Sequence, residues 1–212
     1  MKYHLPEELK KADFNHMFSY CPEERHKVVI KGGELEVPRY QRSFLGTPRI
    51  SSFLNTGQRD TNYKYFASYM FSGEDDSKNN ENLPEIFQPY YDYVISNFSP
   101  DFNQVSINFY KDGNDYIAFH RDCELKMKGE KQILLLTFNE ADDIRHLTFR
   151  LHKTLELPQN EFFKDEIDIP LEHGSMLLFG SNVQKYFKHG IKKSETKQKR
   201  ISMTFRQFEA EE

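Results

Sequence analysis

The chain has 212 residues with 15% aromatic side chains, which suits one domain large enough to bury a core of its own. A formal net charge of −4 argues against a protein that binds nucleic acid through positive charge spread over its whole surface. The sequence has no run of 18 apolar residues, and residues 1–8 lack the apolar core of a signal peptide, so we expect a protein inside the cell, nuclear or cytoplasmic, with no membrane contact.

The first part of the chain indicates a helix, a hairpin and a polar segment. We expect a short helix over residues 6–19, because Pro6 stands near its start and the acidic residues that follow complement the helix dipole. Residues 27–44 favour strands around a turn at a pair of glycines. Residues 46–82 mix aromatic side chains with Arg, Lys and Asn, which suits either stacking on nucleic-acid bases or ordinary core packing.

From residue 84 the pattern becomes regular. Apolar residues recur at helical spacing over 84–98, and this predicted helix ends before Ser99-Pro100, which does not easily continue a helix. Short apolar runs then predict strands over 104–110, 116–122, 131–138, 145–152, 166–171, 175–180 and 200–208. Short strands at this spacing, separated by Gly and Asp turns, are typical of a β-sandwich or jelly roll.

The candidate site residues lie on predicted strands 104–110 and 116–122 and near the turn between them. We expect two strands joined by a turn at residues 111–114, with His120 and Asp122 on one face of the second strand and Asn108 and Tyr110 on one face of the first. The side chains expected to face the other way are Phe109, Ile117 and Phe119. An imidazole and a carboxylate on one strand face suit two adjacent positions around a metal ion, and a second His would complete the 2-His-1-carboxylate set typical of Fe(II).

A His-x-Asp pattern alone arises often by chance, and its alternative is a surface turn with a solvated His. A second pattern near the end of the chain makes the metal interpretation more specific. His189 precedes a predicted strand on which four polar residues share a face, namely Arg200, Ser202, Thr204 and Arg206. Two Arg side chains in a half-polar interior need anions as partners, because a buried guanidinium without one is strongly disfavoured.

Taken together, these segments resemble the AlkB family of Fe(II)- and 2-oxoglutarate-dependent dioxygenases. The resemblance covers about residues 35–207, and it rests on Asn-x-Tyr, Asp-Gly, His-x-Asp, the distal His and Arg-x-x-x-Thr-Phe-Arg. Upstream, Val37-Pro38-Arg39 and Tyr69 to Gly73 are similar to the substrate-recognition region of nucleic-acid-repairing members. The resemblance implies a mainly β (α+β) fold with flanking helices and a double-stranded β-helix core of the jelly-roll, cupin-like type. This core carries an N-terminal nucleotide-recognition extension.

The same resemblance implies the layout of the chain and the role of each site residue. Residues 1–212 would form a single dioxygenase domain, with the substrate-recognition region at 35–83 and the catalytic core at 104–207. The implied Fe(II) ligands are His120, Asp122 and His189. The implied 2-oxoglutarate contacts are Asn108, Tyr110, Arg200 at the distal carboxylate, Ser202, which replaces the usual family Asn, and Arg206 at the keto-acid end. The implied substrate contacts are Arg39, Tyr69, Phe71, Ser72 and Glu124.

The function implied is oxidative dealkylation of N-alkylated nucleobases in DNA or RNA, of the 1-methyladenine and 3-methylcytosine type, with Fe(II), 2-oxoglutarate and O₂. We expect a monomer that acts on a single strand or on a flipped base, because a base inside a duplex is out of reach. Two alternatives stay open: a hydroxylase of a substrate other than nucleic acid, and an inactive nucleic-acid-binding module. Basic residues gather in segments 39–64 and 185–200, which form either a phosphate-binding rim or two solvated faces.

Overall fold

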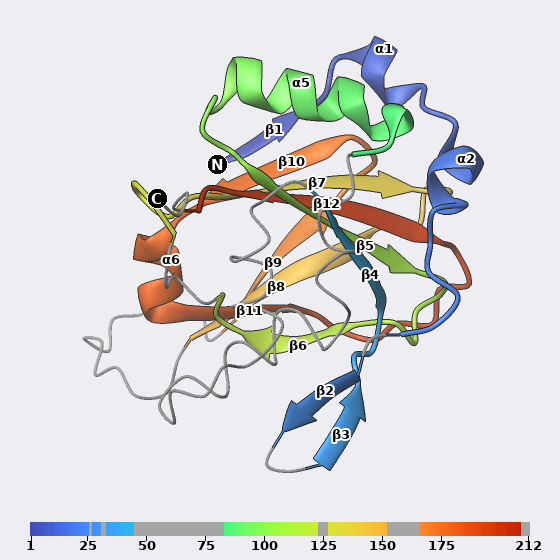
Figure 1. The fold of residues 1–212 in the computed structure, drawn as a ribbon. Coiled ribbons are helices and arrows are strands. Elements are labelled where there is room, and N and C mark those ends of the chain that lie inside the picture. The colour runs from blue at the N-terminus through green and yellow to red at the C-terminus, as the bar shows by residue number, and fades with distance from the viewer. Residues whose placement is uncertain (26, 31–32, 45–82, 123–126, 152–165, 209–212) are drawn as a thin grey trace.

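The computed structural model describes residues 1–25, 27–30, 33–44, 83–122, 127–151 and 166–208. Two antiparallel sheets face each other over this part of the chain, and helices cover the outer side of the larger sheet (Figure 1). The chain is therefore mainly β, as the sequence predicts, and the two facing sheets are consistent with a double-stranded β-helix. Within the described residues, no helix is long and apolar enough to cross a membrane.

The larger sheet has six strands in the order β1-β10-β7-β12-β5-β4. Their bounds are Lys2–His4 (β1), Ser175–Phe179 (β10), Ile133–Asn139 (β7), Arg200–Arg206 (β12), Gln104–Tyr110 (β5) and Tyr40–Phe44 (β4). The smaller sheet has the order β6-β11-β8-β9, with bounds Ile117–His120 (β6), Phe187–Ile191 (β11), Arg145–Leu151 (β8) and Glu166–Leu171 (β9). The predicted hairpin at the glycine pair is confirmed as β2 (Lys27–Ile30) and β3 (Gly33–Glu36).

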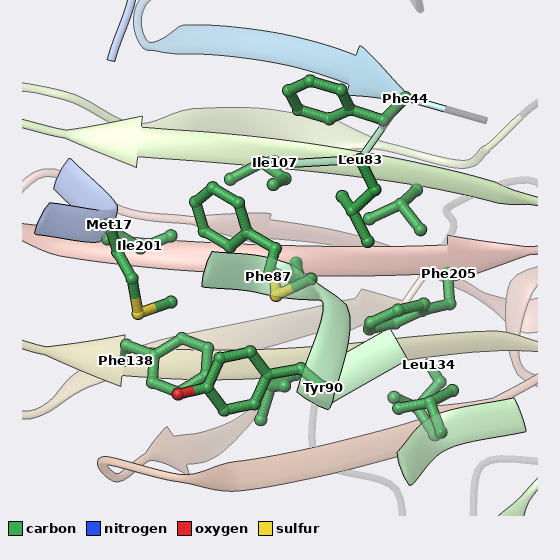
Figure 2. Packing of buried hydrophobic residues seen from close by; sticks show 14 of the residues in the cluster. Met17, Phe44, Leu83, Phe87, Tyr90, Ile107, Leu134, Phe138, Ile201 and Phe205 are labelled. Carbon is green, nitrogen blue, oxygen red and sulfur yellow. The ribbon is translucent and has the colours of Figure 1, made fainter. Parts of the chain in front are cut away.

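The main apolar core lies between the larger sheet and the helices. Met17 of α2 (Phe14–Phe18), Phe87 of η2 (Glu85–Phe87) and Tyr90 of α5 (Gln88–Asn97) are buried there, and Figure 2 shows their side chains against Phe138 and Ile201 of the sheet. Full burial of such side chains stabilises the fold by about 1.5–3 kcal/mol each.

Alternation along β12 assigns the two faces of the larger sheet. Ile201, Met203 and Phe205 are fully buried in the helix-covered core. Every second residue therefore points to the opposite face, between the two sheets. The space between the sheets is lined by the polar residues of β12 and by a second apolar cluster, which includes Ile133 of the larger sheet and Leu147 of the smaller one. The polar side chains of β12 therefore make the interior between the sheets half polar, while its apolar side chains belong to the helix-covered core.

Most predicted elements are confirmed. The helix expected over 84–98 is observed as η2 and α5, and the predicted strands from residue 104 onward are found within two residues at each end. The continuous helix over 6–19 is wrong, because α1 (Glu7–Lys10) stops before Asp13, whose side chain accepts a hydrogen bond from His16 N at 3.0 Å and starts α2 afresh. An N-cap aspartate favours a new helix start over continuation.

The two strands predicted on either side of the turn at residues 111–114 are confirmed as β5 and β6, but they lie in different sheets. Strand β5 pairs with β12 and β4 in the larger sheet, whereas β6 pairs with β11 in the smaller one. The turn after Tyr110 therefore carries the chain from one sheet to the other. Asp115 organises that turn, since its carboxylate accepts a hydrogen bond from Lys111 N at 2.6 Å and pairs with Arg25. Strands β1 and β11 and helix α6 (Ser181–Tyr186) were not predicted.

Candidate metal and co-substrate site

The structure brings together the three residues that the sequence predicts as metal ligands. His120 ends strand β6, Asp122 lies two residues further on, and His189 on β11 is the register partner of His120. One ligand atom from each residue lies within 4.8 Å of those of the other two. Asp122 and His189 are only 6% and 7% exposed, so the cluster is shielded from solvent.

A β-bulge next to the triad decides which side chains of β6 face the cleft. His120 pairs with His189 and Ile117 pairs with Ile191, so the β6 segment between the pairs is one residue longer than that of β11. Both Ile117 and His120 line the cleft as a result. The expectation that Ile117 faces away is wrong, because simple alternation holds only along a strand without a bulge.

Gly190 permits the close approach of β6 at this bulge. A Cβ atom at that position would lie 2.7 Å from the carbonyl oxygen of Ile117 and 3.2 Å from the backbone nitrogen of Phe119. No side chain larger than hydrogen fits without movement of one strand. The absent side chain of Gly190 is therefore part of what keeps His120 beside His189, whose ring centroids lie 4.3 Å apart.

The hydrogen bonds of His120 leave a metal-binding nitrogen facing Asp122. Its Nδ1 lies 2.8 Å from the carbonyl oxygen of Ala118, which accepts only, so Nδ1 carries the hydrogen. The Nε2 lone pair then faces Asp122 Oδ1 at 3.2 Å. Two acceptors facing each other at this distance suit a cation between them, and a His that donates its other ring nitrogen to a carbonyl is typical of metal sites.

Charge states in the cluster also suit a metal ion. Burial by itself raises the pKa of Asp122, but the charge of Arg206 and the neighbouring His120 and His189 together outweigh burial and hold that pKa well below its usual range. Arg206 donates to Asp122 Oδ2 from Nη2 at 2.9 Å and from Nε at 3.2 Å. Burial, and then the neighbouring His120, lower the pKa of His189 to about 3. An ionised carboxylate and a neutral imidazole are the forms that bind metals.

The predicted contacts for a carboxylate co-substrate lie deep on the inner face of the larger sheet. Arg200 is 2% exposed and donates from Nη2 to Thr137 Oγ1 at 3.0 Å, with its Cζ 4.8 Å from the centroid of the Tyr110 ring. Among the described residues, the buried atoms Arg200 Nε, Arg200 Nη1, Tyr110 Oη and Ser202 Oγ have no hydrogen-bond partner. Burial lowers the pKa of Arg200.

These orphaned donors fit a carboxylate. A buried guanidinium whose remaining N–H groups lack partners is costly unless an anion accepts from them, and the planar fork matches a carboxylate bidentately. The hydroxyl groups of Tyr110 and Ser202 are unsatisfied in the same way. The residues present therefore fit 2-oxoglutarate, and Ser202 offers a hydroxyl where the family usually has an amide.

Asn108 is oriented by Arg39, a residue predicted to contact substrate. Arg39 donates from Nε to Asn108 Oδ1 at 2.7 Å and from Nη2 to Gln41 Oε1 at 3.1 Å, and it is only 8% exposed. Because Arg donates only, Asn108 must present its amide oxygen to Arg39 and its NH₂ group elsewhere. Asn108 and Arg39 both line the cleft, and a direct contact of Arg39 with substrate stays a prediction.

The cleft between the sheets has about 630 Å³ of empty space, counting the part that opens to solvent. Besides the triad, its polar lining within the described residues is Arg39, Gln41, Ser106, Asn108, Tyr110, Ser202, Thr204 and Arg206. Its apolar lining is Ile117, Ile133, Leu135, Leu147, Phe179 and Ile191. A cleft with polar and apolar lining and a cluster of metal-binding side chains is a typical place for a small co-substrate and one flat substrate group.

Several predicted contacts lie outside the described residues, namely Tyr69, Phe71, Ser72 and Glu124.

The basic segment 185–200 is partly neutralised, since Lys192 pairs with Glu166 at 2.5 Å and Lys199 pairs with Glu140 at 3.3 Å. For these two lysines the solvated-face alternative fits better than a phosphate rim.

Two buried side chains near the site were not predicted. Gln184 accepts a hydrogen bond from Asp122 N at 2.6 Å, and Arg145 donates to the carbonyl oxygen of Asp115 at 2.7 Å beside the Tyr110 ring. Both contacts join residues at least 30 positions apart. No local sequence signal identifies partners at such distances.

The chain matches one family model and several known proteins. The family model of the 2OG-Fe(II) oxygenase superfamily matches residues 2–206. Mouse alpha-ketoglutarate-dependent dioxygenase alkB homolog 3 is 29% identical over 116 residues, covering 53% of this chain and 39% of the mouse protein. Human DNA oxidative demethylase ALKBH2 is 30% identical over 118 residues, covering 55% of this chain and 44% of the human protein.

A third relative matches over more of the chain. The DNA oxidative demethylase ALKBH2 of Arabidopsis thaliana is 22% identical over 215 residues, covering 95% of this chain and 63% of the plant protein. The chain thus spans less than two thirds of the length of each of these relatives. A crystal structure of an oxidoreductase of the 2OG-Fe(II) oxygenase family from Burkholderia pseudomallei aligns with a TM-score of 0.51 and 12% identity, covering 97% of this chain and 84% of that one. At this identity the likeness concerns the fold alone.

Proposed function

The chain belongs to the 2OG-Fe(II) oxygenase superfamily, and from that premise we propose that it removes alkyl groups oxidatively from N-alkylated nucleobases of DNA or RNA. It is a dioxygenase with an intact set of ligands for Fe(II), His120, Asp122 and His189, and it uses 2-oxoglutarate and O₂ as co-substrates. The observation that carries the nucleic-acid proposal is the similarity to alkB homolog 3 and to DNA oxidative demethylases over about half of the chain.

Each group of site residues would have its own role in the reaction. Bound Fe(II), 2-oxoglutarate and O₂ would supply the oxidation, with one oxygen atom going to the alkyl carbon and the other to succinate while CO₂ leaves. Arg200 and Tyr110 would hold the distal carboxylate of 2-oxoglutarate, and Asn108 would donate its NH₂ group to the co-substrate. Arg206 occupies Oδ2 of Asp122 and leaves Oδ1 toward His120, which keeps that oxygen turned to the metal position.

The hydroxylated alkyl group would then leave the base as an aldehyde, because a carbon bound to both oxygen and nitrogen breaks down readily. The buried cluster and the apolar lining, including Leu147 and Phe179, would exclude water from the reacting centre. A base stacked in a duplex would not reach a metal site buried between two sheets, so the substrate would be single-stranded or flipped.

In this proposal residues 1–212 form one domain, whose catalytic core at 104–207 is a double-stranded β-helix. Residues 35–83 would provide the substrate-recognition extension, and of these the structure describes the stretches up to Phe44 and residue Leu83. The partner would be DNA or RNA that carries alkylated bases, bound by a monomer.

Glu124 would recognise the base. A carboxylate just beyond Asp122 would favour bases with an exocyclic amine, and above all the cationic forms made by methylation of adenine at N1 or cytosine at N3. A charge-assisted hydrogen bond in a dry pocket contributes about 1.5–3 kcal/mol. Glu124→Gln should therefore slow the reaction on 3-methylcytosine more than on the neutral base 3-methylthymine, and an equal effect on both would remove Glu124 from the pocket.

The function is tested by incubating the protein with Fe(II), ascorbate and 2-oxoglutarate and with oligonucleotides that carry 1-methyladenine, 3-methylcytosine or N6-methyladenine. Mass spectrometry of single-stranded and double-stranded forms would measure loss of the methyl group, and His189→Ala serves as the inactive control. We expect loss from 1-methyladenine and 3-methylcytosine. If succinate forms but every oligonucleotide keeps its methyl group, the chain is a dioxygenase of a different substrate. If no succinate forms under any condition, the inactive binding module is the better account.

A further inference from the structure

Asp122 is the only one of the three metal ligands that lies outside a strand. Strand β6 ends at His120, although the sequence predicts that it continues to residue 122, so among the described residues no ladder hydrogen bond holds the backbone at Asp122. Its carboxylate is positioned by Arg206, but that contact acts on the side chain and not on the chain that carries it. The backbone at Asp122 needs a separate anchor if the carboxylate is to stay in place.

Gln184 provides that anchor. Its Oε1 accepts a hydrogen bond of 2.6 Å from the backbone N–H of Asp122, a contact between residues 62 positions apart. Gln184 is 1% exposed, so water does not compete for this bond. Loss of the acceptor would leave a buried N–H without this partner, and the chain would have to move to find another.

The position of Gln184 in the chain links two arms of the triad. It belongs to the short helix α6, which passes directly into strand β11, where His189 follows five residues after Gln184. One short segment therefore carries one metal ligand and holds the backbone of a second. Figure 1 shows α6 beside the end of β11, at the same edge of the structure.

We propose that Gln184 is a positioning residue of the iron site, which sets the place of the Asp122 carboxylate by holding the backbone from which it projects. This inference rests on the metal site of the dioxygenase and not on the nature of its substrate. A residue of this kind does not touch the metal, and its loss typically weakens metal binding about 10–100-fold by releasing a ligand from its place.

The test measures binding of Mn(II) alone, as a redox-inert probe for Fe(II), by calorimetry without 2-oxoglutarate or nucleic acid. Gln184→Leu removes the acceptor at similar volume and keeps a good helix former. Gln184→Glu keeps an acceptor oxygen at the same reach, whether it is ionised or protonated. The matched control is Gln88→Leu, which replaces a Gln in helix α5, on the far side of the larger sheet.

We expect Gln184→Leu to raise the Mn(II) dissociation constant about 10–100-fold. Gln184→Glu and Gln88→Leu should both bind Mn(II) much as the parent does. At saturating Mn(II), all variants should bind 2-oxoglutarate with the parent's affinity, because its carboxylate contacts are intact. Thermal unfolding without metal separates positioning from stability alone, since a stability effect lowers the unfolding temperature without changing the affinity of the folded protein for Mn(II).

Two results would overturn the inference. Parent-like Mn(II) affinity in folded Gln184→Leu would show that the backbone contact does not matter for the metal. Equal weakness of Gln184→Glu and Gln184→Leu would show that the acceptor oxygen is not the cause. If Gln184→Leu does not fold, Gln184→Asn takes its place and is read in the same way, because its amide is one methylene too short for the 2.6 Å contact.

Discussion

Substitution of Gly190 by Ala would place a methyl group where strand β6 now lies. The new Cβ would sit 2.7 Å from the Ile117 carbonyl oxygen and 3.3 Å from the carbonyl carbon of Ala118, both backbone atoms that cannot rotate away. Carbon and oxygen atoms of neighbouring strands approach to about 3.3 Å, so the strands must separate by roughly 0.6 Å. Metal sites tolerate changes of only about 0.2 Å in ligand distances. The separation of the strands at Gly190 is therefore larger than the change in ligand distance that a metal ion bound by His120 and His189 would tolerate.

We expect Gly190→Ala to weaken Mn(II) binding about 10–100-fold, as for other changes that displace ligands, and to cost about 1–3 kcal/mol of folding free energy from overpacking. Calorimetry with Mn(II) and urea unfolding of the metal-free protein measure the two effects. Gly129→Ala is the matched control, because Gly129 has a φ of 57° and a Cβ there would meet nothing closer than Gln207 Oε1 at 3.5 Å, so the change introduces backbone strain without pushing two strands apart. It should lose stability but keep its metal affinity. Parent-like Mn(II) affinity in folded Gly190→Ala would refute the argument.

Three further outcomes follow from the site. Arg200→Lys should raise the 2-oxoglutarate concentration needed for half-maximal succinate formation at least about tenfold, because an ammonium group cannot reproduce the fork; an unchanged requirement would move that role to another residue. Arg39→Met should weaken 2-oxoglutarate binding to the Mn(II)-loaded protein, because Asn108 loses the donor that orients its amide, while Mn(II) affinity stays constant. The metal-free protein should lose stability as pH falls from 6.5 toward 3, since unfolded His189 takes up a proton that the buried ring, with its pKa of about 3, does not. Urea unfolding over that pH range should show a shallower slope for His189→Asn, and an identical slope would contradict the assignment.

Local patterns along single strands were enough to predict much of this protein. Strand β12 alternates apolar residues such as Ile201 with polar residues such as Arg200, and this period-2 pattern correctly separates the core face from the cleft face. The triad of His120, Asp122 and His189 was predicted through the resemblance to a known family, which rests on the His-x-Asp pattern and the later His, and the structure brings the three together.

Tertiary structure decided what depends on partners distant in sequence. Strand β6 joins the smaller sheet because it pairs with β11, and the bulge in that pairing turns Ile117 into the cleft against its local alternation. Gln184 lies 62 residues after Asp122 in the chain, and it reaches Asp122 only because helix α6 packs beside the end of β6. The sequence by itself determined the strands and the core face, since these follow from side-chain type and local period, and its family motifs identified the ligands. Only the folded chain decided sheet membership, register and the anchoring of Asp122, because the energies that settle them come from contacts between segments with no common local pattern.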